Sequence, residues 1–292
     1  MQGKSGIILR GIGGFYYVKT TDKIYECKLR GKFRKNKEIA LVGDRVEICL
    51  DNNLEGSCAV IEKIYDRKNF FIRPPISNID KLFIVVSTCD PEPNTIIIDE
   101  LTALSYSQRV KPILIISKVD LKEISWLIDI YKQAKIKTIL FSKFDKSGID
   151  EIKESLKGCV SAFTGNSGVG KSTILNFIDD KFKLETNVTS KKLGRGKHTT
   201  RHVELLKIKD GGFVADTPGF SKLDFYKCID LQNENLINFF PDLKKFSNNC
   251  KFKSCSHTCE KGCSVIKALD EKKISLSRYN SYLFLKRYIK NT

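Results

Sequence analysis

The order of three short motifs constrains the fold of this chain more than any other sequence feature. Residues 165–172 read GNSGVGKS and match the phosphate-binding pattern G-x-x-x-x-G-K-[ST]. The segment SKVD at residues 117–120 resembles a guanine-reading loop and lies before this motif, whereas DTPG at residues 216–219 lies after it. In ordinary G domains the phosphate loop comes first. The observed order therefore predicts a circularly permuted G domain.

The phosphate loop lies between an apolar run at residues 158–164 and a predicted helix at residues 172–179, as nucleotide binding requires. Its glycines let backbone amides approach phosphate oxygens, and the helix N-terminus adds a positive dipole. We expect Lys171 to reach the β- and γ-phosphates and the Ser172 hydroxyl to ligate Mg²⁺. The nucleotide-binding residues predicted here are Gly165, Asn166, Ser167, Gly168, Val169, Gly170, Lys171, Ser172 and Thr173.

The base-reading segment follows the apolar run at residues 113–116, which predicts a buried strand. An Asp120 carboxylate can accept two hydrogen bonds from guanine, and adenine offers no such pair of donors. GTPases more often have Asn at the position of Ser117, whose shorter side chain predicts weaker base affinity. Ser142 and Lys143 follow the next predicted strand, and they are expected either to support the base or to cap a helix. The predicted base contacts are Ser117, Lys118, Val119, Asp120, Ser142 and Lys143.

Residues 194–200 read GRGKHTT and are typical of a switch loop, because they combine glycines with charge. We expect Thr200, rather than Thr199, to complete a Mg²⁺ shell with Ser172 and Asp216. The Gly219 amide is expected to contact the γ-phosphate, so that its loop senses whether this phosphate is present.

Phe220 occupies the position at which many GTPases have a Gln that orients the attacking water. A neutral imidazole can orient or deprotonate water, so His198 is the candidate catalytic residue. The alternative is that His198 is a solvated loop histidine.

The last cysteines of the chain form the pattern C-x4-C-x-H-x5-C at residues 250–263. Three thiolates and one imidazole suit a structural Zn²⁺ ion, which would supply the folding energy of a segment too short for a core. The predicted ligands are Cys250, Cys255, His257 and Cys263, and the spacing alone leaves Cys259 open as a substitute. The other cysteines are scattered and are expected to be small core residues of a reduced cytosolic protein.

Three domains are expected. Five short β-like runs predict an N-terminal OB-fold barrel over residues 1–70, and its basic stretch at 28–37 is either an RNA-facing loop with Phe33 as a stacking aromatic or a solvated loop. Apolar strands alternating with helices predict a multidomain α/β chain with a permuted P-loop domain over 71–225. Residues 226–292 are expected to form a zinc-binding domain with a helix at 274–289.

The formal net charge of +17 over 292 residues points to an anionic partner. No apolar run approaches the roughly 18 to 20 residues that span a bilayer, so RNA is favoured over a membrane. A lysine-rich proteome is the alternative source of part of this excess. We expect a cytoplasmic monomer.

Taken together, the motifs at 165–172, 194–200, 216–220 and 250–263 resemble those of the ribosome small-subunit-dependent GTPase A family, RsgA. The resemblance covers essentially the whole chain. It implies a GTPase stimulated by the small (30S) ribosomal subunit, contacts with its rRNA, and a role in late subunit maturation. It also implies that His198 acts in hydrolysis and that Cys250, Cys255, His257 and Cys263 are the zinc ligands.

Two other functions compete with this interpretation. A P-loop kinase for a small molecule would share the phosphate loop, but Asp120 argues for guanine and no lid segment is evident. An RNA-binding module with a vestigial nucleotide site would share the charge. Intact Lys171, Ser172 and Asp216 argue against it.

Overall fold

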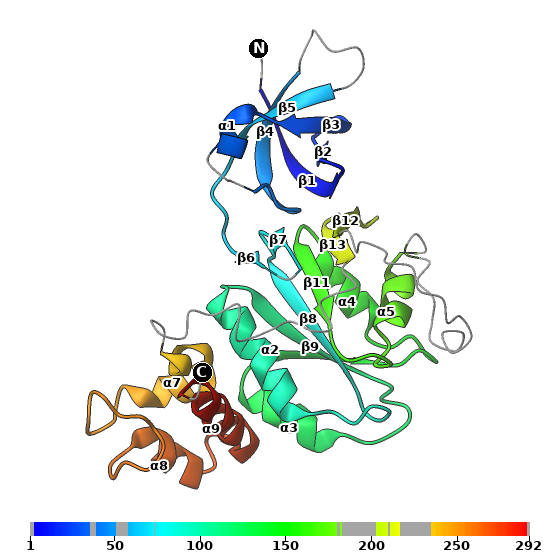
Figure 1. The fold of residues 1–292 in the computed structure, drawn as a ribbon. Helices are drawn as coiled ribbons and strands as arrows, with labels where there is room; N and C mark the ends of the chain where they lie inside the picture. Colours follow the sequence, from blue (N-terminus) through cyan, green and yellow to red (C-terminus); the bar gives the residue numbers. More distant parts are fainter. Residues whose placement is uncertain are drawn as a thin grey trace, which may run out of the picture.

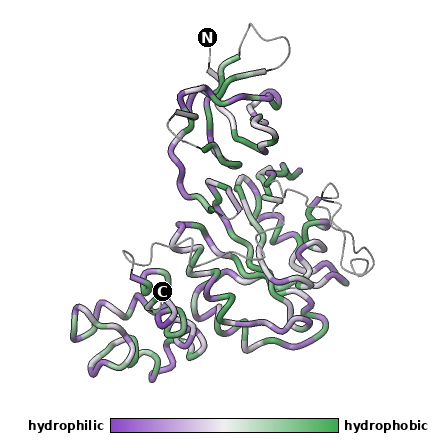
Figure 2. The backbone as a smooth tube through the Cα atoms, viewed as in Figure 1, coloured by the Kyte–Doolittle hydropathy of each residue, from purple (hydrophilic) through white to green (hydrophobic). Residues whose placement is uncertain are grey.

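The structure is a computed structural model that describes residues 3–35, 39–50, 58–72, 74–179, 182, 203–209, 211–216 and 235–290. Figure 1 shows a small barrel at the N-terminal end, a central sheet flanked by helices, and a helical module that lies beside helix α2. Hydrophobic stretches run through the central sheet (Figure 2), in which β8 (Lys81–Ser87) and β9 (Lys111–Ser117) are buried along most of their length. No helix among these described residues is long and apolar enough to cross a membrane.

The N-terminal strands close into a five-stranded barrel of the OB type. They pair in the order β1-β2-β3-β5-β4, and β4 pairs again with β1; β3 and β5 are parallel and the other pairs antiparallel. Alternate residues such as Ile8, Val18 and Ile61 are fully buried inside it. The barrel predicted from the sequence is confirmed, with strands β1 (Lys4–Ile12), β2 (Phe15–Lys19), β3 (Ile24–Leu29), β4 (Arg45–Leu50) and β5 (Cys58–Ile64).

The expectation that Phe33 is an exposed stacking aromatic is wrong. Residues Gly31–Lys35 form a short helix, α1, and Phe33 is only 6% exposed within the barrel core. The helix turns this side chain inward while the adjacent Lys32 remains exposed, an arrangement that a count of local charges does not reveal.

A short two-stranded sheet, β6 (Phe70–Phe71) and β7 (Ile76–Ser77), leads into the central domain. The order of the central sheet is β10-β9-β8-β11-β13-β12, with all neighbours parallel except β12. Its strands are β8 (Lys81–Ser87), β9 (Lys111–Ser117), β10 (Lys137–Phe141), β11 (Val160–Thr164), β12 (Glu204–Lys207) and β13 (Phe213–Asp216). Strands β12 and β13 form the antiparallel pair.

Helices cover both faces of this sheet, and alternate residues of β8 serve the two faces. Leu82 and Ile84 pack with α2 and α3, whereas Phe83 and Val85 pack with α4 and α5. The helices are α2 (Thr95–Ser107), α3 (Ser125–Gln133), α4 (Ile149–Leu156) and α5 (Lys171–Ile178).

The permuted connectivity leaves the sheet continuous. Strand β11 lies between β8 and β13, although the chain reaches it only after β10. Since parallel strands end at the same edge of a sheet, the loops after β8, β9, β10, β11 and β13 all emerge there. The same sheet continues into the barrel, because β1 pairs with β12 at Arg10 and Glu204.

The C-terminal module consists of the 3₁₀-helix η3 (Leu236–Phe239) and helices α7 (Pro241–Ser247), α8 (Ser264–Asp270) and α9 (Leu276–Lys290). A fully buried guanidinium joins it to the central domain. Arg278 of α9 donates to Asp99 of α2 at 2.7 Å and to both carboxylate oxygens of Asp242 at 2.7 and 3.0 Å. The Tyr131 hydroxyl donates to the same Asp99 oxygen at 2.9 Å.

Candidate nucleotide site and metal cluster

The phosphate loop runs from the end of β11 to the first turn of α5, as the motif requires. Gly165 has φ +141°, and a Cβ atom there would lie 2.1 Å from the carbonyl oxygen of Val85. Gly170 precedes the helix with φ +93°. These two positions therefore need glycine for close approach and for backbone conformation.

Lys171 folds back over the loop. Its Nζ donates to the carbonyl oxygens of Gly165 and Asn166, each at 2.6 Å, and burial lowers the pKa of its ammonium group. The ammonium group thus lies on the concave side of the loop. When nucleotide binds there, phosphate oxygens would replace these carbonyl oxygens as its hydrogen-bond acceptors. Ser172 and Thr173 follow in the first turn of α5 and are half-buried.

A direct hydrogen bond joins the base-reading segment to the phosphate loop. The Ser117 hydroxyl is 1% exposed and donates to the carbonyl oxygen of Val169 at 2.6 Å. The sequence predicted that this side chain would face the base, but the structure places its hydroxyl on the phosphate loop. Two motifs that lie far apart in the chain are therefore in direct contact.

Lys118 lies across the ends of β9 and β8. Its backbone has φ +59°, its carbonyl oxygen accepts from the Thr88 hydroxyl at 2.7 Å, and its Nζ donates to the carbonyl oxygen of Cys89 at 3.1 Å. Val119 is half-buried and Asp120 is exposed, so the carboxylate is accessible to a ligand. Thr88, which the sequence analysis missed, fixes this backbone.

The loop after β10 lies beside the base-reading segment, because Phe141 of β10 pairs with Ser117 of β9. Ser142 is 2% exposed, and its hydroxyl accepts a hydrogen bond from the Phe144 amide at 3.1 Å. Ser142 therefore caps a local turn rather than a helix. Lys143 is exposed.

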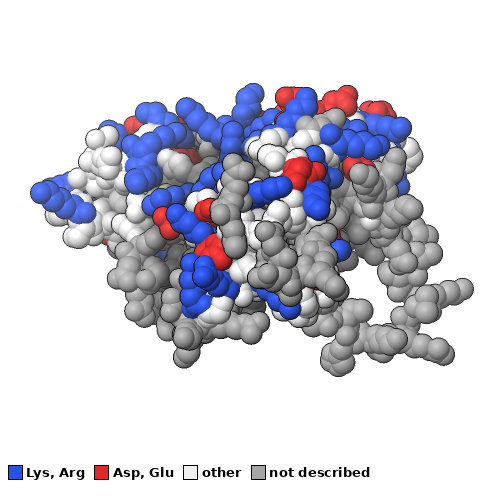
Figure 3. Space-filling view, turned by 90° about the horizontal axis from the view of Figure 1, so that it is seen from above, with Lys and Arg blue, Asp and Glu red and all other residues white. Residues whose placement is uncertain are grey.

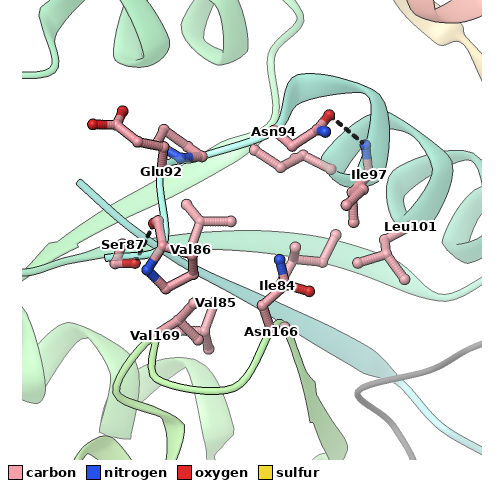
Figure 4. Close-up of a pocket in the computed structure, with 14 residues that line it drawn as sticks. Ile84, Val85, Val86, Ser87, Glu92, Asn94, Ile97, Leu101, Asn166 and Val169 are labelled. Carbon is pink, nitrogen blue, oxygen red and sulfur yellow. Dashed lines mark hydrogen bonds between the residues drawn. The ribbon is translucent and has the colours of Figure 1, made fainter. Parts of the chain in front are cut away.

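A pocket separates the phosphate loop from the start of α2. Figure 4 shows Asn166 and Val169 on one side of it and Asn94, Ile97 and Leu101 on the other. Asn94 caps α2 by accepting from the Ile96 amide at 2.9 Å. Most of the residues that line this pocket are apolar. The pocket therefore suits an apolar side chain better than a phosphate group.

The remaining predicted nucleotide residues are only partly described. Asp216 ends β13, whose Ala215 pairs with Ala162 of β11, so its backbone lies next to the strand that leads into the phosphate loop. His198, Thr200 and Gly219 lie outside the described residues.

The predicted metal ligands come together. The ligand atoms of Cys250, Cys255, His257 and Cys263 all lie within 4.8 Å of one another. The Cys250 and Cys263 sulfurs are 3.9 Å apart, and each is 3.5 Å from His257 Nδ1. Tetrahedral geometry with metal–ligand bonds of about 2.0–2.3 Å gives separations of roughly this size. The donor set therefore fits a metal ion, and Cys259, which is exposed, is not part of this cluster.

Residues outside the ligand set hold the metal loop in place. Tyr279 of α9 donates to the His257 carbonyl oxygen at 2.9 Å, and a Glu260 oxygen accepts from the Thr258 amide at 3.0 Å. Burial lowers the pKa of His257, which favours the neutral imidazole that binds metals. Burial raises the pKa of the Cys255 thiol to about 12, so metal binding must displace a proton.

Comparison with known proteins decides the family. A family model described as RsgA GTPase matches residues 64–226, and one described as RsgA N-terminal domain matches residues 5–58. The chain belongs to the RsgA family of GTPases. As a member of this family, it is a GTP hydrolase.

Two curated relatives named small ribosomal subunit biogenesis GTPase RsgA illustrate the similarity. The protein from Caldanaerobacter subterraneus subsp. tengcongensis is 43% identical over 99% of this chain and 97% of its own length. The protein from Bacillus cereus is 43% identical over 95% of this chain and 94% of its own.

Solved RsgA-like structures share the whole architecture. YjeQ from Thermotoga maritima superposes with a TM-score of 0.82 at 32% identity and full coverage of both chains. YloQ, described as a circularly permuted GTPase, has a TM-score of 0.83 at 32% identity and covers 99% of this chain and 96% of its own. The permuted fold expected from the motif order is confirmed.

Proposed function

We propose that this GTPase is a cytoplasmic, monomeric switch that acts in late maturation of the small (30S) ribosomal subunit and is stimulated by that subunit. The observation that carries the proposal is the Ser117–Val169 hydrogen bond, which joins a guanine-reading loop to a phosphate loop. The relatives are named for biogenesis of the small ribosomal subunit, which supports that subunit as the partner.

In this proposal each part of GTP has its own residues. Asp120 accepts hydrogen bonds from guanine, the amides of residues 165–173 and the Lys171 ammonium hold the phosphates, and the Gly219 amide senses the γ-phosphate. Ser172, Thr200 and Asp216 would hold Mg²⁺, which neutralises phosphate charge. His198 orients the attacking water.

The outer face of the barrel is the surface we assign to rRNA. The Arg10 guanidinium lies 4.3 Å from the Tyr17 ring centroid, and Lys28 Nζ lies 5.0 Å from that of Phe15. Basic and aromatic side chains lie next to each other here, as they do on surfaces that stack single-stranded bases. Lys and Arg predominate over acidic residues on the molecular face seen in Figure 3, which suits a phosphate backbone.

We further propose that the metal cluster holds one structural Zn²⁺ ion and that the C-terminal module contacts rRNA. Zn²⁺ suits three thiolates and one imidazole. The module carries exposed cations such as Lys251 and Lys253 next to Phe252, which is 48% exposed.

The proposal is tested by GTP turnover with and without purified small subunits. We expect small subunits to raise the rate at least about tenfold, large subunits to leave it unchanged, and a Lys171→Ala variant to lose the stimulated rate. Equal rates with and without small subunits would refute the ribosome-linked role. A second measurement compares small-subunit affinity with GDP and with a non-hydrolysable GTP analogue, and equal affinities would refute the switch.

A further inference from the structure

The loop after β10 presents an aromatic ring to solvent. Phe144 is 71% exposed, the largest exposed fraction among the large hydrophobic side chains that the structure describes. Burying a Phe side chain stabilises by about 1.5–3 kcal/mol, so this ring leaves much of its hydrophobic contribution available to a ligand.

The backbone under this ring is tightly fixed. The buried Ser142 hydroxyl accepts from the Phe144 amide, and Asp145 Oδ1 accepts from the Ser147 amide at 3.0 Å. At Gly148, with φ +76°, a Cβ atom would lie 2.1 Å from the Leu140 carbonyl oxygen. The turn therefore closes tightly onto β10 and holds Phe144 at a defined position.

That position is next to the proposed guanine-reading carboxylate. Phe141 and Ser117 are paired on adjacent parallel strands, so Phe144 and Asp120 both lie three residues beyond the paired positions. Neighbouring strands are about 4.8 Å apart. The two loops thus emerge side by side at one edge of the sheet.

Strands β8 and β10 flank β9, so the loops that follow them lie on opposite sides of this position. Lys118 extends toward β8, where its Nζ reaches the Cys89 carbonyl oxygen, whereas Phe144 comes from the β10 side. Lys143 Nζ lies 5.3 Å from the Phe144 ring centroid. A cation over one ring face leaves the other face for a flat partner.

We infer that Phe144 stacks on the guanine base and, opposite the Lys118 side chain, forms one wall of the base slot. The inference rests on the proposed assignment of Asp120 to guanine. Asp120 selects the base by hydrogen bonding, and Phe144 adds affinity that does not distinguish one purine from another. Phe144 is thus a binding residue that the nucleotide motifs do not include.

The test measures nucleotide affinity of the full-length protein by calorimetry. Base–aromatic stacking contributes about 1–3 kcal/mol, so Phe144→Ala should weaken GDP and GTP binding by the same factor, at least about fivefold. Phe144→Tyr should restore affinity. Inorganic tripolyphosphate has no base, so its inhibition of nucleotide binding should be the same in Phe144→Ala as in the wild type. Leu140→Ala is the matched control, because Leu140 is 40% exposed on β10 and should change affinity less than twofold.

A fluorescence measurement gives a readout specific for stacking. The chain has one tryptophan, Trp126, so Phe144→Trp in a Trp126→Phe background places the only indole in the proposed slot. We expect GDP to quench this indole and ADP to leave it unchanged at the same concentration.

Different outcomes would refute the stacking contact and the guanine site. A Phe144→Ala variant with wild-type affinity for GDP, or with reduced affinity only for the small subunit, would overturn the stacking inference. If the wild-type protein bound ATP as tightly as GTP, the proposed guanine site itself would fail, whatever Phe144 does.

Discussion

At the scale of single residues, Ser117 shows how a short side chain can join two loops by a hydrogen bond. Its buried hydroxyl donates to the carbonyl oxygen of Val169 on the phosphate loop. The sequence predicted a loss of affinity from its limited reach. That expectation remains a prediction, and the hydrogen bond adds a second contribution, because it joins the base-reading loop to the phosphate loop.

We expect Ser117→Ala to weaken GDP binding about five- to tenfold, because a buried hydrogen bond contributes about 1–1.5 kcal/mol and the Val169 carbonyl oxygen would lose its partner. Ser117→Thr keeps the hydroxyl and should retain affinity. Ser161→Ala on β11 is the control, since the buried Ser161 hydroxyl has no hydrogen-bond partner among the described residues. Calorimetry with GDP checks this, and equal affinities for the wild type and Ser117→Ala would contradict it.

Gly165 offers a second test at this scale. We expect Gly165→Ala to abolish detectable nucleotide binding and lower the unfolding temperature, since its Cβ would lie 2.1 Å from a backbone oxygen of β8. Gly158→Ala is the matched control, because it also has a positive φ of +65° but meets nothing within 4 Å. It should retain GDP binding. If Gly165→Ala bound GDP normally, the close packing of the phosphate loop on β8 would be refuted.

The sequence allowed the strands and the ligand sets to be predicted, because both are local. Apolar runs define the strands, and cysteine spacing defines the metal cluster. Contacts between distant segments were not predictable. Phe33 lies among lysines yet is buried, and Arg278 lies in a basic helix yet pairs with Asp99 and Asp242. Their surroundings are set by tertiary packing, which neither spacing nor periodicity records.

At the scale of elements, helix α9 supports the metal loop. Tyr279 donates to the carbonyl oxygen of His257, and Tyr282 donates to that of Ser256 at 3.1 Å. The helix thus contacts the backbone of the loop, while the cluster side chains provide the metal ligands. Neither part is expected to keep its structure alone.

Removal of the metal with a chelator should therefore unfold residues 250–263 and expose the amides of α9 to hydrogen exchange. Strands β8, β9 and β11 should stay protected, because the side chains on their other face pack with α4 and α5 in a cluster that contains no metal ligand. Cys255→Ser should have the same effect, whereas Cys259→Ser should not, since Cys259 lies outside the cluster. Unchanged exchange in α9 after verified metal loss would contradict this dependence.

At the scale of the whole molecule, a strand pair and a buried ion pair are among the contacts that join the three parts. Strand β1 of the barrel pairs with β12 of the central sheet, and Arg278 ties the C-terminal module to α2. Helix α2 begins beside the phosphate loop, at the pocket shown in Figure 4. The buried ion pair therefore connects the surroundings of the nucleotide site to the metal module.

We expect Asp99→Asn to destabilise the protein by about 3–5 kcal/mol, because it weakens the compensation of a fully buried guanidinium. Burial raises the pKa of Asp99 and the Arg278 charge opposes that shift, so the ionised pair depends on both partners. Glu92→Gln is the control, since it breaks an exposed ion pair with Lys122 and should cost less than about 1 kcal/mol. Denaturant unfolding measures the loss of stability in both variants. Similar losses would contradict a stabilising role of the buried Arg278–Asp99 ion pair.

The central claim is that the permuted chain forms one guanine site from loops that lie far apart in sequence. Competition of GTP and ATP for bound fluorescent GDP tests it most directly, in the wild type and in Asp120→Asn. We expect displacement by GTP but not by ATP, and a loss of GTP affinity of at least about 100-fold in the variant, because two charge-assisted hydrogen bonds are weakened. Equal displacement by ATP, or unchanged affinity in Asp120→Asn, would contradict it.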